Sequence, residues 1–158
     1  SYKNMIKILF ICHGNICRSP MAEFVMKDLV QKADLSDQFE IASAATSREE
    51  IGNPVHRGTR EKLKQYGISV AGKHAVQMTG SDYRYYDYIV AMEQYNLRNM
   101  ERFCYGDPDQ KVHLLLDFTD RKGDIADPWY TGNFDETYDD VLEGCQGLLK
   151  YICDNDLA

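Results

Sequence analysis

A short apolar run near the start of the chain ends directly at a cysteine, and a helix signal follows within a few residues. Residues 5–11 are rich in isoleucine and predict a buried strand. The next segment, residues 12–20 (CHGNICRSP), leads into apolar residues at helical spacing, with Ser19 as the expected N-cap and Pro20 at the first helical position. The chain therefore opens as a strand, a tight loop and a helix.

Strand and helix patterns alternate along the rest of the chain. The expected strands are residues 39–43, 87–92 and 112–116, the expected helices are about 54–66 (ended by Gly67), 93–103 and 134–152, and the expected loops are 44–53 and 117–133. This alternation predicts an α/β fold, a doubly wound four-stranded parallel sheet of order 2-1-3-4 with helices on both faces. No repeat or linker interrupts the 158 residues, so we expect a single domain over residues 1–158.

The charge balance limits the partners of the chain. Lys and Arg total 18 against 25 Asp and Glu, and the formal net charge of −7 repels nucleic acid. No apolar run approaches the ~20 residues that cross a membrane, and the first residues lack the features of a signal peptide. The five cysteines are irregularly spaced, which is typical of a reducing compartment. We expect a cytoplasmic monomer with no nucleic-acid or membrane partner.

The loop after the first strand lies where doubly wound sheets bind ligands, beyond the carboxyl ends of the strands. A tight turn points successive backbone N–H groups inward, and the following helix adds unpaired donors and the positive end of its dipole. Gly14 and Asn15 tolerate the backbone angles that such a ring requires, and the Arg18 guanidinium can grip two phosphate oxygens. The sequence therefore predicts a phosphate-binding loop.

Cys12 stands at the mouth of this loop. Donors that hold an oxyanion also stabilise a thiolate, and reactive thiols ionise at pH ~3.5–7.5. We therefore expect Cys12 to attack phosphorus as a thiolate, giving a cysteinyl-phosphate that water hydrolyses. A lone cysteine after a strand is more often a small buried hydrophobic residue, but the neighbouring turn, arginine and helix start favour the catalytic interpretation.

The motif resembles the C-x5-R-S-P signature of the low-molecular-weight protein tyrosine phosphatases. The resemblance covers nearly the whole chain, in order. The matching segments are residues 12–23, 43–46, 51–54, 67–68, 87–92, 96–97 and 127–130. It implies hydrolysis of tyrosine-phosphorylated proteins and small aryl phosphates without a cofactor or metal, with inorganic phosphate as product and inhibitor.

The resemblance also implies site roles: Cys12 as nucleophile, Arg18 as phosphate-binding residue and Asp127 as general acid. The backbone amides that would bind phosphate belong to His13, Gly14, Asn15, Ile16, Cys17 and Arg18, and the residues that would brace the loop are Asn15, Ser19 and Ser43. An Asp-Pro pair is by itself more typical of a solvated turn. Because an ordinary aspartate is ionised at pH 7, the acid role of Asp127 predicts an acidic pH optimum.

Trp129 and Tyr130 are expected to wall the substrate pocket beside Asp127. Many relatives place an aromatic residue where this chain has Glu49, so we expect one wall to lack its ring and the rim, with Glu50, to carry negative charge. The hypothesis is that acidic phosphopeptides are disfavoured and that basic residues beside the phosphotyrosine help. The alternative is a solvated pair of glutamates.

Cys17 lies five positions after Cys12, so a reversible disulfide between the two is a plausible guard against over-oxidation. Cys12, His13 and Cys17 lack the second ligand pair of a zinc site. The remaining cysteines, Cys104, Cys145 and Cys153, are expected to be packed thiols.

Three other functions remain as alternatives. A thiol-dependent arsenate reductase has the same fold and loop, but residues 68–103 contain no cysteine to relay its disulfide. A sugar-phosphotransferase component with a phosphocysteine leaves Arg18 and Asp127 without a clear purpose. A non-catalytic phosphotyrosine-binding or redox-sensing module would commonly have lost one of the three chemical residues, all of which are present here.

Overall fold

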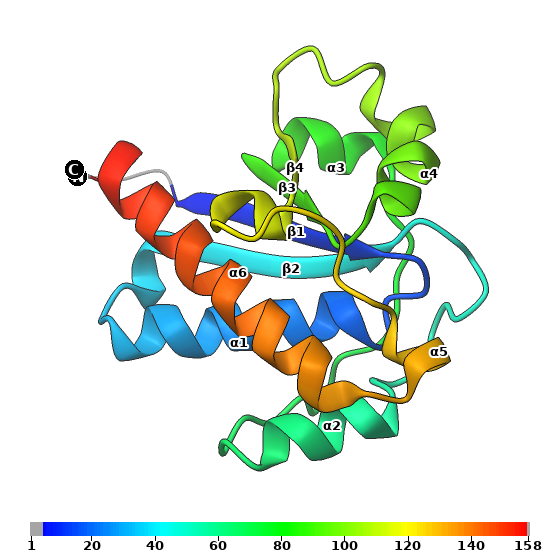
Figure 1. The fold of residues 1–158 in the computed structure, drawn as a ribbon. Coiled ribbons are helices and arrows are strands. Elements are labelled where there is room, and N and C mark those ends of the chain that lie inside the picture. The colour runs from blue at the N-terminus through cyan, green and yellow to red at the C-terminus, as the bar shows by residue number, and fades with distance from the viewer. Residues whose placement is uncertain (1–4, 158) are drawn as a thin grey trace.

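Four parallel strands form the centre of the molecule (Figure 1). They are β1 (Ile6–Cys12), β2 (Phe39–Ala45), β3 (Tyr88–Ala91) and β4 (Val112–Leu114), in the order β2-β1-β3-β4. The predicted order 2-1-3-4 is therefore confirmed. The computed structural model describes residues 5–157, so the two ends of the predicted domain, residues 1–4 and 158, lie outside the described part of the chain.

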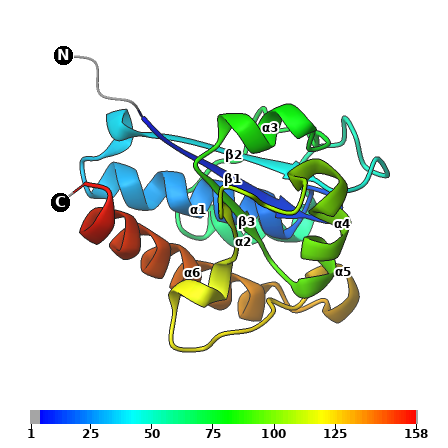
Figure 2. The ribbon, with the colours of Figure 1, turned by 90° about the horizontal axis from the view of Figure 1, so that it is seen from above.

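Helices cover both faces of this sheet (Figures 1 and 2). On one face lie α1 (Arg18–Lys32) and α6 (Phe134–Asn155), with α2 (Arg57–Lys64) beside them, and on the other lie α3 (Gly80–Tyr85) and α4 (Gln94–Cys104). The shorter elements are α5 (Pro128–Thr131) and two 3₁₀ turns, η1 (Ser36–Gln38) and η2 (Leu115–Phe118).

The central position of β1 in the sheet explains why the N-terminal run is mostly apolar. Its side chains alternate between the two layers: Ile8 and Phe10 pack in the core under α1 and α6, whereas Leu9 and Ile11 pack in the core under α3 and α4. From Ile8 onward both faces of the strand are buried, and the residues that follow the half-buried Lys7 are all apolar as far as Cys12. Cys12 is consequently delivered to the carboxyl edge of the sheet.

Two predicted helix starts were wrong. The helix expected over residues 54–66 begins only at Arg57, because Pro54 forms an antiparallel bridge with His74 and the His56 ring caps α2 by accepting a hydrogen bond from the Gly58 amide. Helix α1 begins at Arg18 after Cys17 as N-cap. The Ser19 hydroxyl is not a cap, because it is engaged inside the preceding loop.

Other boundaries moved by a few residues. Strand β2 runs to Ala45 rather than 43, strand β3 covers 88–91, strand β4 ends at 114, and helix α6 continues to Asn155. The predicted loop over 117–133 contains the end of η2 and the whole of α5. Helix α3 was not predicted, although its capping box between Thr79 and Asp82 is visible in the sequence. Helix α2 ends at Lys64 rather than 66, and Gly67, in the turn that follows, has the expected left-handed conformation with a φ of 73°.

Candidate active site

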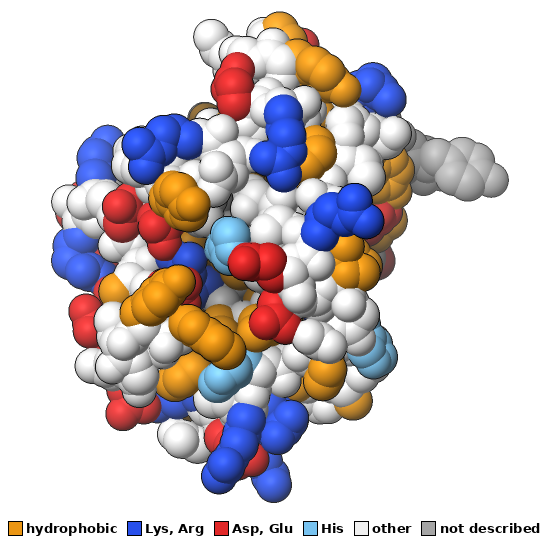
Figure 3. All heavy atoms as spheres, turned by 90° about the vertical axis from the view of Figure 1, so that its right-hand side faces the viewer, with side chains coloured by type: hydrophobic (Ala, Val, Ile, Leu, Met, Phe, Trp, Pro, Cys, Tyr) orange, Lys and Arg blue, Asp and Glu red, His pale blue; other side chains and the backbone are white. Residues whose placement is uncertain are grey.

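The segments that follow β1 and β2 meet α5 at the carboxyl edge of the sheet. They enclose a cavity of about 200 Å³, and acidic, histidine and hydrophobic side chains surround a hollow on this face of the molecule (Figure 3). The cavity is lined by Cys12, His13, Gly14, Ile16, Cys17, Arg18, Glu49, Glu50, Asp127, Trp129 and Tyr130. The cavity thus brings together residues from three separate stretches of the sequence.

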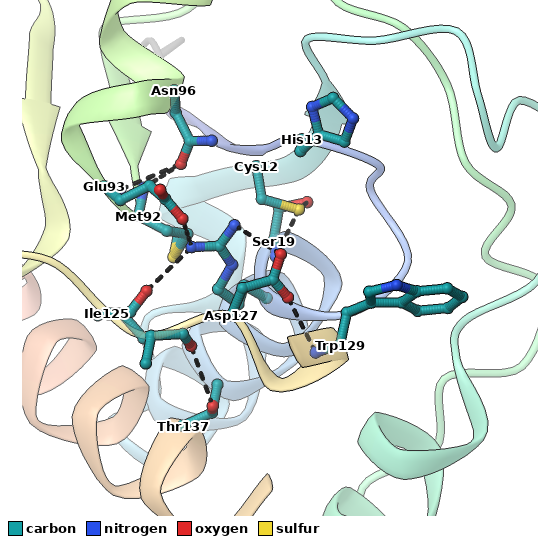
Figure 4. Close-up of polar contacts among 12 residues, drawn as sticks. Cys12, His13, Ser19, Met92, Glu93, Asn96, Ile125, Asp127, Trp129 and Thr137 are labelled. Atoms are coloured by element: carbon teal, nitrogen blue, oxygen red, sulfur yellow. Dashed lines mark hydrogen bonds and ion pairs between the residues drawn. The ribbon is translucent and has the colours of Figure 1, made fainter. Parts of the chain in front are cut away.

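Cys12 lies buried at the base of the loop formed by residues 12–18. Its Sγ is 3.0 Å from the Ser19 Oγ, and the Ser19 backbone N–H donates to it at 3.4 Å (Figure 4). The sulfur also faces the N-terminus of α1, whose first amides have no partner within the helix. Each of these neighbours favours negative charge on the sulfur.

The buried Asn15 side chain holds the 12–18 loop in shape. Its Nδ2 donates to the Ser19 Oγ at 2.8 Å and to the Ser43 Oγ at 2.9 Å, and its Oδ1 accepts from the Val76 N–H at 3.1 Å. Asn15 has a φ of 58°, the left-handed conformation that asparagine tolerates better than most residues. All three residues expected to brace the loop therefore form one hydrogen-bonded group.

The Arg18 guanidinium is only 2% exposed and is held from several directions. Nη1 donates to Glu93 and to the Ile125 carbonyl at 2.9 Å, and Nη2 lies 3.3 Å from Asp127 Oδ2. Burial acts to lower the pKa of Arg18, but the negative charges of Cys12, Asp127 and Glu93 outweigh it and raise the pKa above its ordinary value. Arg18 is a fixed cation in the site.

Glu93 was missed in the sequence. It follows β3 at the same sheet edge as Cys12, and that position was its available signal. Its side chain both pairs with Arg18 and takes part in the capping box of α4 with Asn96. Glu93 therefore connects the guanidinium to a rigid helix start.

Asp127 caps the short helix α5 and points toward the cavity (Figure 4). Its Oδ1 accepts from the Trp129 N–H at 3.0 Å, which leaves Oδ2 beside Arg18. Pro128 occupies the first helical position and fixes the chain direction after the aspartate. The loop is tied to α6 through the Thr137 hydroxyl, which donates to the Ala126 carbonyl at 3.3 Å.

The pocket wall at Glu49, which was expected to lack an aromatic ring, carries the imidazole ring of His13. Glu49, with its side chain 67% exposed, contacts His13 Nε2, and the His13 ring stacks on Tyr95 with a centroid separation of 6.3 Å. Glu49 and Glu50 place the expected negative charge at this wall, but the Glu49 carboxylate is paired with His13. On the other side Trp129 is 57% exposed, and its ring meets the His56 ring in a T-shaped contact with a centroid separation of 5.6 Å.

Cys17 is buried, and its thiol and that of Cys12 are both free. Burial, together with the negative charges of Cys12 and Asp127, raises the pKa of Cys17. The two cysteines line one cavity but differ in character, because Ser19 and the helix start face Cys12.

Among residues 5–157, no group of three or more His, Cys, Asp or Glu side chains is placed to hold a metal ion. No helix in the described part of the chain has the length and apolar character to cross a membrane.

Comparisons with known proteins agree with this geometry. The model of the family described as low molecular weight phosphotyrosine protein phosphatase matches residues 7–157. The low molecular weight protein-tyrosine-phosphatase YfkJ of Bacillus subtilis is 40% identical over 150 residues, which cover 94% of this chain and 96% of the relative. The YfkJ crystal structure matches with a TM-score of 0.95 over 99% of both chains, at 38% identity. The crystal structure of SP-PTP, a low molecular weight protein tyrosine phosphatase from Streptococcus pyogenes, matches with a TM-score of 0.85 over 97% of both chains, at 42% identity.

Proposed function

Because the chain belongs to the low molecular weight phosphotyrosine protein phosphatase family and hydrolyses phosphotyrosine, we propose that Cys12, Arg18 and Asp127 carry out this reaction in two displacement steps. In the first step the Cys12 thiolate attacks phosphorus, the bond to the tyrosine oxygen breaks, and Asp127 donates a proton to the leaving phenolate. In the second step water attacks the cysteinyl-phosphate, Asp127 takes a proton from the water, and Cys12 leaves as a thiolate with release of inorganic phosphate.

The phosphate group would be bound by the 12–18 loop before either step. The backbone amides of His13, Gly14, Asn15, Ile16 and Cys17, with the amide and guanidinium of Arg18, are the proposed donors. Glu93 and the Ile125 carbonyl already hold the guanidinium, so little reorganisation is needed when the dianion enters.

One observation carries this proposal: the Cys12 sulfur is held by Ser19 at the start of α1, in the same cavity as Arg18 and Asp127. The test is hydrolysis of p-nitrophenyl phosphate by the wild type beside Cys12→Ser. Phosphotyrosine and phosphoserine peptides of one sequence provide a second arm. We expect only the phosphotyrosine ring to reach the recessed loop past Trp129 and Tyr130, and equal rates on the two peptides would contradict a tyrosine-specific pocket.

We propose that Glu49 sets the preference for residues beside the phosphotyrosine. Its exposed carboxylate lines both the catalytic cavity and an adjoining cavity of about 570 Å³ that also contains Glu93 and Asp124. Glu49→Trp is expected to raise kcat/KM for acidic phosphopeptides relative to basic ones by about 2- to 5-fold, the size of one exposed charge interaction. Glu61→Gln, an exposed change on α2, is the control and should leave the ratio alone. An unchanged ratio in Glu49→Trp would leave Glu49 as a solvated residue.

We also propose that Cys17 protects Cys12 from over-oxidation. Peroxide would convert the Cys12 thiolate to a sulfenic acid, and attack by the Cys17 sulfur would then form a disulfide and release water. The support is that both sulfurs line one small cavity. Without Cys17, further peroxide would carry the sulfenic acid on to the sulfinic acid, which dithiothreitol does not reduce. After excess peroxide and then dithiothreitol, the wild type should therefore recover its activity while Cys17→Ser stays inactive. Equal recovery of the two proteins would remove this role from Cys17.

The physiological setting is part of the same proposal. We propose a cytoplasmic monomer that acts on tyrosine-phosphorylated proteins and is inhibited competitively by inorganic phosphate, which would bind the same loop as product. The described cysteines are all free, which suits a reducing compartment. Phosphate inhibition kinetics and sedimentation measurements test the inhibition and the monomer directly.

A further inference from the structure

Lys73 places a largely buried cation behind the 12–18 loop. Its side chain is 13% exposed, its Nζ donates to the Ser43 carbonyl at 2.8 Å, and it lies 3.4 Å from Glu23 Oε1. Burial lowers the pKa of Lys73, and the charges of Glu23 and Cys12 act in the opposite direction. A buried ammonium group is costly unless it is paired, so these two acceptors define where it sits.

Glu23 is the buried partner of this cation. Its Oε1 accepts a hydrogen bond from the Ser43 hydroxyl at 2.6 Å, and its Oε2 accepts from Lys27 at 2.6 Å. The Lys27 side chain is 43% exposed, and besides its contact with Glu23 its Nζ lies over the Phe24 ring, 4.8 Å from the centroid. Lys73 differs from Lys27 because it contacts both Glu23 and the backbone of Ser43.

These contacts fix the direction of a chain of hydrogen bonds. A carboxylate only accepts, so the Ser43 hydroxyl must give its proton to Glu23 and can only accept from Asn15 Nδ2. The Asn15 orientation is fixed by the Val76 N–H on its Oδ1, and its Nδ2 also donates to Ser19. The Ser19 hydroxyl proton is then left for Cys12 Sγ, 3.0 Å away.

We propose that Lys73 is a positioning residue for the reaction. By holding the Glu23 carboxylate and the Ser43 carbonyl, it keeps the hydrogen-bond chain oriented so that Ser19 donates to the Cys12 thiolate. Lys73 acts through Ser43, Asn15 and Ser19 and does not touch the substrate. The inference rests on the proposed role of Cys12 as a thiolate nucleophile.

The test is the pH dependence of Cys12 alkylation by iodoacetamide in Lys73→Met and Lys73→Gln. Loss of the cation should move the midpoint of Cys12 ionisation up by about one pH unit, with alkylation near pH 6 about tenfold slower. Lys27→Met is the matched control, because it removes the other Glu23 cation without touching Ser43. It should stay within about twofold of the wild type, because exposed pairs contribute little. Circular dichroism identifies which variants are folded.

The outcomes separate the two proposals. A shifted midpoint in a folded Lys73 variant, with Lys27→Met unchanged, supports the positioning role. The wild-type midpoint in either folded Lys73 variant, or an equal shift in Lys27→Met, overturns it. Two Lys73 substitutions are used because Gln retains a donor for the Ser43 carbonyl, which keeps one variant close to the native packing. A wild type that has no reactive thiolate at neutral pH would instead refute the proposed nucleophile.

Discussion

Cys12→Ser is expected to abolish the turnover of aryl phosphates, with kcat falling by roughly 10⁴-fold or more. A serine hydroxyl is not ionised near neutral pH, whereas the thiol sits among donors that favour its anion. The measurement is steady-state hydrolysis of p-nitrophenyl phosphate by wild type and variant. The hydrogen bond from Asn15 to Ser19, which braces the loop, does not involve the sulfur, so the variant should still bind phosphate.

A matched cysteine substitution makes this result specific. Cys153→Ser changes a partly exposed thiol near the end of α6, and it should retain wild-type kinetics. When Cys12→Ser is immobilised on a resin, it should also bind tyrosine-phosphorylated proteins without hydrolysing them. The captured proteins would identify the physiological substrates. Activity in Cys12→Ser within tenfold of the wild type would place the nucleophile elsewhere.

Asp127→Asn is expected to slow the release of a poor leaving group by about 10²- to 10⁴-fold. A tyrosine phenolate has a conjugate acid of pKa ~10, so its departure needs a proton in the transition state. Asparagine retains the oxygen that caps α5 and accepts from the Trp129 N–H, so the chemical role is removed with little structural change. The measurement is kcat for phenyl phosphate and for p-nitrophenyl phosphate, whose leaving group, p-nitrophenol, is the more acidic phenol.

The two esters and the pH profile distinguish general acid catalysis from other defects. The loss should be larger for phenyl phosphate, and the fall in wild-type kcat with rising pH should disappear in Asp127→Asn, because the wild-type aspartate must be protonated to act. Asp120→Asn, an exposed change in the same connection, is the control. Equal losses on both esters, or an unchanged pH profile, would contradict the acid role of Asp127.

The sheet could be predicted because its signal is local. The isoleucine-rich apolar run of β1 and the alternation of strands with helices were enough to give the parallel order. Boundaries failed where a distant contact competes with local preference. Pro54 is a good helix start by itself, but its bridge to His74 draws it into extended structure and leaves α2 to begin at Arg57.

The site was predictable to a different degree at each residue. Cys12 and Arg18 stand in one loop, whose strand–turn–helix setting gives the chemistry directly. Asp127 is separated from them by more than a hundred residues, and only the family resemblance placed it in the site. The contacts of His13 with Glu49 and of Lys73 with Ser43 join segments that are 30 or more residues apart in the sequence, so local patterns gave no signal for them.

Ionisation of Cys12 in the unliganded protein tests the central claim most directly. The ultraviolet thiolate absorbance of the wild type minus that of Cys12→Ser, followed across pH, isolates this one sulfur. If the 12–18 loop is charged and shaped for a dianion before substrate arrives, the difference is already present below pH 7. A difference that appears only near pH ~8.5, where an ordinary thiol ionises, would contradict a preformed thiolate.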